Sequence, residues 1–106
     1  MIFVLDIGNT NTVLGVFKND ELTYEWRIQT NRHRTEDELA VLVKSLFDLH
    51  DIEISDVLAV VVSSVVPPIM YAVEKMCHKY FGLTPLIVGK DDVTTYLDIV
   101  YPQPKE

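Results

Sequence analysis

The chain has 106 residues and a formal net charge of −7; 48% of its residues are hydrophobic and 24% are charged. Such a composition is typical of one small globular domain and excludes intrinsic disorder. The acidic balance also argues against nucleic acid or an anionic membrane surface as partner, because both require clustered Lys and Arg.

The amino-terminal residues combine two apolar runs with a polar turn between them. The apolar run Ile2 to Leu5 predicts a buried strand that ends in Asp6, and the run Val13 to Phe17 predicts a second strand. The turn between them, residues 8–11 (Gly-Asn-Thr-Asn), makes the pair a β-hairpin. Backbone N–H groups of such a turn can cradle a polyphosphate while the carboxylate holds Mg²⁺. An ordinary hairpin would favour the same residue types, because Gly and Asn readily adopt the positive φ of tight turns. A phosphate-binding turn and an ordinary hairpin turn therefore both stay open.

A third strand is predicted from strict alternation between residues 22 and 28. Four apolar side chains share one face of this strand: Leu22, Tyr24, Trp26 and Ile28. We expect the strand to lie toward the edge of the sheet with its other face in solvent. Arg27, on that polar face, is most simply the cross-strand partner of a carboxylate.

A helix is predicted over residues 36–49. Thr35 stands three residues before Glu38, which is a capping-box arrangement, and an apolar stripe follows it. The stripe consists of Leu39, Leu42, Val43, Leu46 and His50. The three histidines, His33, His50 and His78, share no spacing that zinc sites use, so we expect none of them to ligate a metal.

The rest of the chain predicts two parallel strands joined by a helix. Residues 57–62 are continuously apolar, as in a central parallel strand, and Ser63, Ser64 and the two following prolines are expected to shape a strand-to-helix turn. The helix carries a buried stripe and ends at Gly82, and residues 86–88 form a last short strand. The residues of that stripe are Ile69, Val73, Met76, Cys77 and Tyr80.

Together these elements predict an α/β domain with a mixed five-stranded sheet, three antiparallel strands followed by two parallel ones, and helices packed on it. No P-loop or Rossmann glycine motif occurs, which excludes both nucleotide-binding classes. The one cysteine, Cys77, permits no internal disulfide and suits a reducing cytosol. No apolar run approaches the roughly 20 residues of a membrane span. We therefore expect a soluble, cytoplasmic protein.

The segment Asp6-Ile7-Gly8-Asn9-Thr10-Asn11 resembles the first phosphate motif of the acetate and sugar kinase/Hsc70/actin superfamily. In its D-x-G-N-T form it is similar to the type III pantothenate kinases. Residues 26–30, 34–38 and 63–68 and the pair Tyr101-Pro102 match that family's pattern in the same order. The resemblance spans nearly the whole chain, and it implies the ribonuclease-H-like (actin-like ATPase) fold of the superfamily.

The resemblance implies a homodimeric enzyme that phosphorylates pantothenate to 4'-phosphopantothenate with ATP, Mg²⁺ and a monovalent cation (K⁺ or NH₄⁺), the first step of coenzyme A biosynthesis. It assigns Asp6 to the metal and Gly8, Asn9, Thr10 and Asn11, with Asp6, to the phosphates. Tyr101 matches the residue that contacts pantothenate.

The general base of the family is the Asp of a G-A-D-R motif, which we expect beyond Glu106. Residues 1–106 are therefore expected to form a single amino-terminal domain of a two-domain kinase, with the carboxy-terminal domain absent from this chain and little activity without it. A non-catalytic transcriptional accessory factor of the same family, or another kinase or phosphatase of the superfamily, is the alternative. A G-A-D-R motif soon after residue 106 would favour the kinase.

Overall fold

The structure, a computed structural model, describes residues 1–64 and 66–89. Its elements in chain order are β1 (Ile2–Ile7), β2 (Asn11–Lys18), β3 (Glu21–Gln29), α1 (Glu36–Asp48), the 3₁₀ turn η1 (Ile54–Asp56), β4 (Ala59–Ser64), α2 (Pro67–Met76), the π-helical turn η2 (Cys77–Phe81) and β5 (Leu86–Val88). Tyr101 lies outside the described residues. No helix in the described part of the chain is long and apolar enough to cross a membrane.

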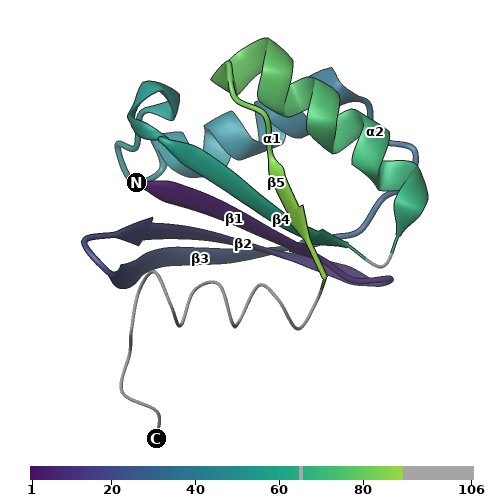
Figure 1. The fold of residues 1–106 in the computed structure, drawn as a ribbon, viewed down its shortest axis with the longest axis horizontal. Coiled ribbons are helices and arrows are strands. Elements are labelled where there is room, and N and C mark those ends of the chain that lie inside the picture. Colours follow the sequence, from purple (N-terminus) through teal and green to yellow (C-terminus); the bar gives the residue numbers. More distant parts are fainter. Residues whose placement is uncertain (65, 90–106) are drawn as a thin grey trace, which may run out of the picture.

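The five strands form one sheet in the order β3-β2-β1-β4-β5. β1 pairs antiparallel with β2, and β2 with β3, whereas β4 is parallel to both β1 and β5. Figure 1 shows α1 and α2 on the same side of this sheet. The predicted mixed α/β sheet is confirmed, and its strand order and directions are those of the ribonuclease-H-like unit.

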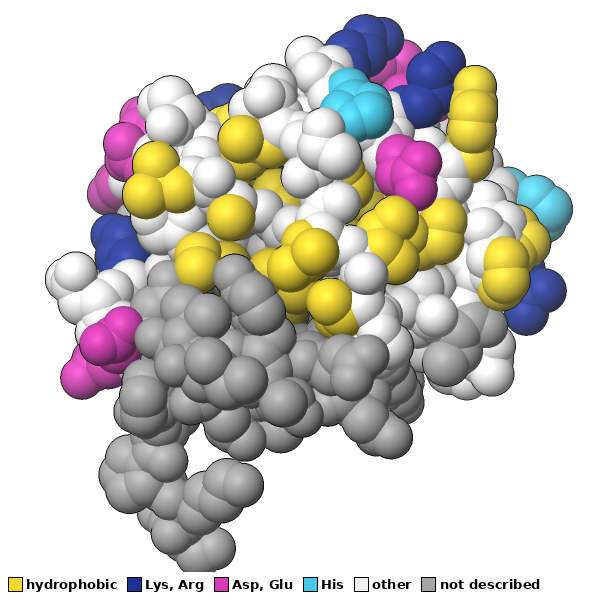
Figure 2. Space-filling model, viewed as in Figure 1, with side chains coloured by type: hydrophobic (Ala, Val, Ile, Leu, Met, Phe, Trp, Pro, Cys, Tyr) yellow, Lys and Arg dark blue, Asp and Glu magenta, His cyan; other side chains and the backbone are white. Residues whose placement is uncertain are grey.

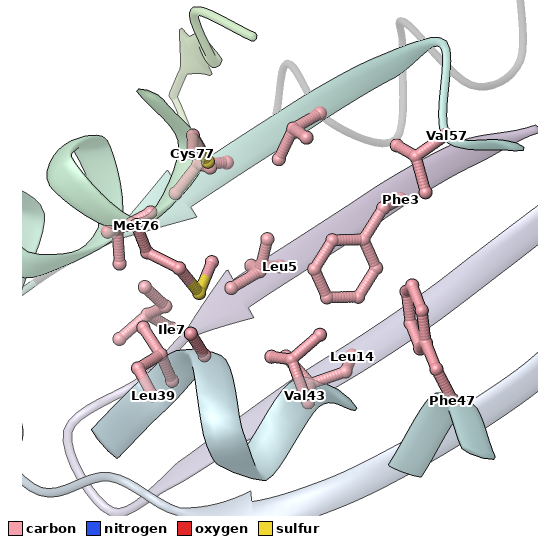
Figure 3. Packing of buried hydrophobic residues seen from close by; sticks show 14 of the residues in the cluster. Phe3, Leu5, Ile7, Leu14, Leu39, Val43, Phe47, Val57, Met76 and Cys77 are labelled. Carbon is pink, nitrogen blue, oxygen red and sulfur yellow. The ribbon is translucent and has the colours of Figure 1, made fainter. Parts of the chain in front are cut away.

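The main core lies between the sheet and the two helices. Alternate residues of β1 (Phe3, Leu5 and Ile7) point toward the helices and are buried there (Figure 3). Phe3 meets Phe47 of α1 edge to face, with ring centroids 5.2 Å apart. The other residues of β1 face the opposite side of the sheet, where Ile2 and Val4 belong to a second, smaller apolar cluster. β1 is therefore buried on both faces, and its carboxyl end is fixed by packing on either side.

Helix α1 begins as the sequence predicts. The Glu38 N–H donates to the Thr35 hydroxyl and the Thr35 N–H donates to the Glu38 carboxylate, both at 3.1 Å, which completes the predicted capping box. Leu39 and Val43 of the predicted stripe are buried. His50, by contrast, is exposed and stacks on the Tyr24 ring at 4.2 Å, since it lies beyond the last turn of the helix.

The predicted stripe of the second helix is wrong at Tyr80. The helix widens into the π-helical turn η2 after Met76, and this changes the angular spacing of the side chains that follow. Tyr80 is consequently 42% exposed and its hydroxyl donates to the carboxylate of Asp37 on α1. The predicted cap is confirmed, because Gly82 has φ 65° and its N–H donates to the Cys77 carbonyl.

Two further boundaries differ from the prediction. Residues 54–56 form the 3₁₀ turn, which the Val57 N–H closes by donating to the Ile54 carbonyl at 3.0 Å. The strand therefore begins at Ala59, two residues after its predicted start at Val57, and runs to Ser64. On β3, Leu22 lies beyond a register shift opposite Val16 and Phe17 and is 42% exposed rather than buried.

Cys77 behaves as the small buried hydrophobe that the sequence predicts. The side chain belongs to the main core, and burial raises the pKa of its thiol to about 12. Because the thiolate is the reactive form, this cysteine is not a nucleophile at neutral pH.

Candidate functional site

The carboxyl ends of β1 and β4 lie side by side and bring the sequence-predicted polar residues together. β1 and β4 are parallel neighbours with Asp6 in register with Ser63 and Ile7 with Ser64. The turn of residues 8–11, hereafter the 8–11 turn, leaves the sheet at this same edge. In open α/β sheets, ligands bind outside the carboxyl ends of parallel strands, so this edge is the candidate functional site.

Asp6 points away from the helices. Since side chains alternate along β1 and Leu5 and Ile7 pack in the main core, Asp6 shares the opposite face with Val4. The side chain is half-buried and makes no hydrogen bond or ion pair with any described residue. A half-buried carboxylate without a protein partner is available to a cation or a bound water.

The 8–11 turn does not require positive φ. Within the described residues, positive φ occurs only at Asn19, Asp20, Asp51 and Gly82. The interpretation of Gly8 as an ordinary left-handed hairpin glycine is therefore wrong. The Gly8 N–H donates to the Asn11 carbonyl at 3.0 Å, and a Cβ on Gly8 would stand 3.0 Å from that same oxygen. Glycine suits this position because a Cβ would make an unusually tight contact with the Asn11 carbonyl and would require the turn to shift.

The tip of the turn presents unpaired donors. The backbone N–H groups of Asn9 and Thr10 donate to no acceptor in the described part of the chain, and both residues are exposed. Their side chains likewise make no hydrogen bond with a described residue. Consecutive free N–H groups form the kind of concavity in which proteins bind anions.

A residue that the sequence did not single out contacts this turn from the protein side. The Thr30 hydroxyl donates to the Gly8 carbonyl at 2.7 Å, and the Thr30 N–H donates to the Thr10 carbonyl at 2.9 Å. The Thr12 and Thr30 hydroxyl oxygens lie 2.8 Å apart. In the sequence, Thr30 stood out only as the last residue of the segment 26–30 that matches the family pattern. The pairing of β2 with β3 brings it to the turn.

The two serines at the end of β4 have different surroundings. The Ser64 hydroxyl accepts from the Val66 N–H at 2.9 Å, as expected of a residue that shapes the strand-to-helix turn. Ser63 does not share this role. Its side chain is 1% exposed, and its hydroxyl is the one buried side-chain polar atom of the described residues that has no hydrogen-bond partner.

Arg27 lies on the same face of the sheet as Asp6. It stands in register with Val13 on β2, which in turn stands in register with Asp6. Two strand spacings of about 4.8 Å place the Arg27 and Asp6 backbones about 10 Å apart. The predicted ion pair of Arg27 with a carboxylate is not formed within the described residues.

Side chains that could ligate a metal are not clustered in the described part of the chain. No group of three or more His, Cys, Asp or Glu side chains could hold an ion there. A cation at Asp6 would therefore take this one carboxylate and obtain its remaining ligands from water and from the oxygens of a bound ligand. Mg²⁺ is held in that way at nucleotide sites, so the donor set fits Mg²⁺.

Comparison with known proteins places this chain among kinases of one family. A family model described as type III pantothenate kinase matches residues 2–106. The type III pantothenate kinases of Geobacillus kaustophilus (strain HTA426) and Geobacillus thermodenitrificans (strain NG80-2) are 55% and 56% identical to it over 106 residues. These matches cover the whole chain and 41% of each relative, so the chain spans about two fifths of their length.

A solved structure of an Aquifex aeolicus member of the Ppx/GppA protein family is also similar, with a TM-score of 0.48 and 17% identity. That match covers 99% of this chain and 40% of the other.

Proposed function

This chain belongs to the type III pantothenate kinase family, and on that premise we propose that the protein carrying it phosphorylates pantothenate to 4'-phosphopantothenate with ATP. One observation carries the proposal: Asp6, at the carboxyl end of β1, has no partner among the described residues, and neither do the Asn9 and Thr10 N–H groups in the turn that follows this strand. Neither feature is needed to hold the hairpin together. Both suit a ligand that combines phosphate oxygens with a metal ion.

The chemistry requires positioning and charge neutralisation rather than a protein nucleophile. Phosphoryl transfer passes through a state with charge spread over the phosphate oxygens, and fixed N–H donors stabilise that charge without reorganising. In our proposal Asn9 and Thr10 donate to these oxygens, and Gly8 allows the close approach of the ligand. Asp6 would hold Mg²⁺, which when bound neutralises phosphate charge.

The net charge of −7 gives the chain no overall attraction for ATP, so binding depends on these local groups. Arg27 adds a cation on the face that carries Asp6, within reach of a ligand lying across that face.

The other parts of the proposed enzyme lie outside the described residues. We assign the pantothenate contact to Tyr101 and the general base to an Asp beyond Glu106, in the remaining three fifths of the length of its relatives. A carboxy-terminal domain would complete the ATP cleft. A homodimer, a requirement for K⁺ or NH₄⁺ and a cytoplasmic location complete the proposal.

Pantothenate-dependent ATP consumption tests this proposal. The assay uses the complete protein, meaning the full-length protein that carries residues 1–106, with Mg²⁺ and either K⁺ or Na⁺. We expect turnover that requires pantothenate and is faster in K⁺. A folded complete protein that binds no ATP and shows no turnover would favour the accessory factor, and ATP turnover with another acceptor would favour a different kinase of the superfamily.

A further inference from the structure

We propose that Thr30 is a positioning residue for the 8–11 turn, whose hydroxyl sets the direction of the phosphate-binding Asn9 N–H group. The inference rests on the proposed function in one respect, namely that this turn binds phosphate. Thr30 itself lies behind the turn and is not expected to touch the ligand.

The hydrogen bonds around Thr30 have a defined direction. A threonine hydroxyl carries one proton, and the Thr30 proton is donated to the Gly8 carbonyl at 2.7 Å. The Thr12 hydroxyl, 2.8 Å away, must therefore donate to the Thr30 oxygen. The result is a relay from Thr12 through Thr30 to the Gly8 carbonyl. Thr12 is only 5% exposed, so water does not compete freely for the start of this relay, and each hydrogen bond polarises the next.

The relay determines where a backbone donor points. The Gly8 carbonyl and the Asn9 N–H belong to one peptide group, and in a planar trans peptide these two groups point in opposite directions. Since Thr30 holds the carbonyl toward the protein, the Asn9 N–H is directed away from it. This N–H is one of the two donors without an acceptor among the described residues. Rotation of this peptide would break the 2.7 Å bond and turn the donor away from the ligand.

Thr30 is itself held in place by the segment around it. The Thr30 N–H donates to the Thr10 carbonyl at 2.9 Å, which ties the other end of the turn to the same residue. On the preceding residue, the Gln29 carbonyl accepts from the Arg34 guanidinium at 3.0 Å. Thr30 therefore donates hydrogen bonds to two carbonyls of the turn. The β2–β3 pairing and the Arg34 contact hold Thr30 in the position from which it does so.

The test compares two Thr30 variants of the complete protein with wild type. Thr30→Val keeps the branched shape and removes the hydroxyl, whereas Thr30→Ser keeps the hydroxyl. Thr23→Val is the matched control, because Thr23 lies on β3, the strand that ends one residue before Thr30, is exposed and donates only to the Glu21 carbonyl at 3.3 Å. The measurements are Mg²⁺-ATP affinity by calorimetry, KM for ATP and for pantothenate, and melting temperature.

We expect Thr30→Val to weaken Mg²⁺-ATP binding by roughly tenfold, the equivalent of one orienting hydrogen bond. KM for pantothenate should stay unchanged, because its proposed contact lies elsewhere. Thr30→Ser should restore affinity to near the wild-type value, and Thr23→Val should not alter it.

Equal ATP affinity in wild type and Thr30→Val would overturn the proposal. A loss of affinity in Thr30→Ser as large as in Thr30→Val would also overturn it, since the effect would then not depend on the hydroxyl. If Thr30→Val does not fold, the serine variant together with Thr12→Val, which removes the first donor of the relay, decides in the same way. Wild-type protein that binds no Mg²⁺-ATP would mean that the proposed function itself fails, and the Thr30 proposal with it.

Discussion

Asp6 is the charged group at the carboxyl end of β1, half-buried and without a partner among the described residues. We expect Asp6→Asn in the complete protein to lower kcat by about 10² or more. The substitution removes the negative charge of the carboxylate that would hold the metal ion during phosphoryl transfer. The melting temperature should be unaffected, since no described contact is removed. Turnover near the wild-type value would remove Asp6 from the mechanism.

Gly8 tests the geometry of the 8–11 turn. In Gly8→Ala the new Cβ would stand 3.0 Å from the Asn11 carbonyl oxygen, which can give way only by a shift of the turn itself. We expect ATP affinity, measured by calorimetry, to fall more than thermal stability does, because the free donors sit on that turn. A large loss of stability with unchanged affinity in the remaining folded protein would show that Gly8 serves only the hairpin.

Ser63 and Ser64 form a matched pair for a stability measurement. The Ser63 hydroxyl is buried and unpaired, so Ser63→Ala should raise the free energy of unfolding by about 1 kcal/mol. Ser64→Ala should lower it by about 1 kcal/mol, because the Val66 N–H loses its acceptor. Urea denaturation of both variants beside wild type measures the difference. Destabilisation by Ser63→Ala as well would show that its hydroxyl has a partner in solution.

At this scale the sequence located some residues of the candidate site and not others. Asp6 and the 8–11 turn could be found because they are contiguous and match a motif. Thr30 could not be singled out, and Ser63 was assigned to the strand-to-helix turn, because their surroundings depend on strand register: the β2–β3 pairing brings Thr30 to the turn, and the β1–β4 pairing sets Ser63 opposite Asp6. A motif search does not contain that information.

At the scale of elements, α1 and η2 are joined by one carboxylate. Lys79 and then Tyr80 donate hydrogen bonds to Asp37, and together they hold the pKa of that carboxyl below its usual value of 3.8. A lowered pKa means that the contact contributes stability above pH 3.8, which is lost as the pH falls through the value of the folded state.

We therefore expect wild type to be more stable than Asp37→Asn at pH 7 and the difference to shrink as the pH falls below 3.8, measured by urea denaturation. The groups are exposed, so the effect should be small and should shrink in high salt. Lys44→Ala, which removes the pair with Asp48 within α1, is the control for an exposed ion pair that joins no second element. A difference that shows no decrease as the pH falls below 3.8 would contradict this account.

The elements themselves were largely predictable. Hydrophobic periodicity and the capping box located β1, β2, β3 and α1, because each follows one regular spacing. The errors arose where the spacing changes: the 3₁₀ turn before β4 and the π-helical turn after α2. Tyr80 was predicted to be buried because the α-helical spacing was extended past Cys77, where the structure has a π-helical turn instead.

At the scale of the whole molecule, the helices cover one face of the sheet and leave apolar side chains at the β5 edge. Leu86 and Ile87 are 47% and 51% exposed. Figure 2 shows hydrophobic side chains across the middle of the face that carries β5, with charged side chains mainly around its rim. An apolar surface of this kind favours association with another surface, so we expect residues 1–106 alone to fold with marginal solubility or to self-associate.

The predicted fold and family are confirmed, and they support the central proposal, namely that this chain would supply the phosphate-binding part of a pantothenate kinase site whose other parts lie outside residues 1–106. The most direct test is pantothenate-dependent ATP consumption by residues 1–106 beside the complete protein, at equal molar concentration and with both shown to be folded by circular dichroism. We expect turnover in the complete protein and none above background in residues 1–106, because the proposed base and the rest of the ATP cleft lie outside them. Comparable specific activity in the two proteins would contradict the claim.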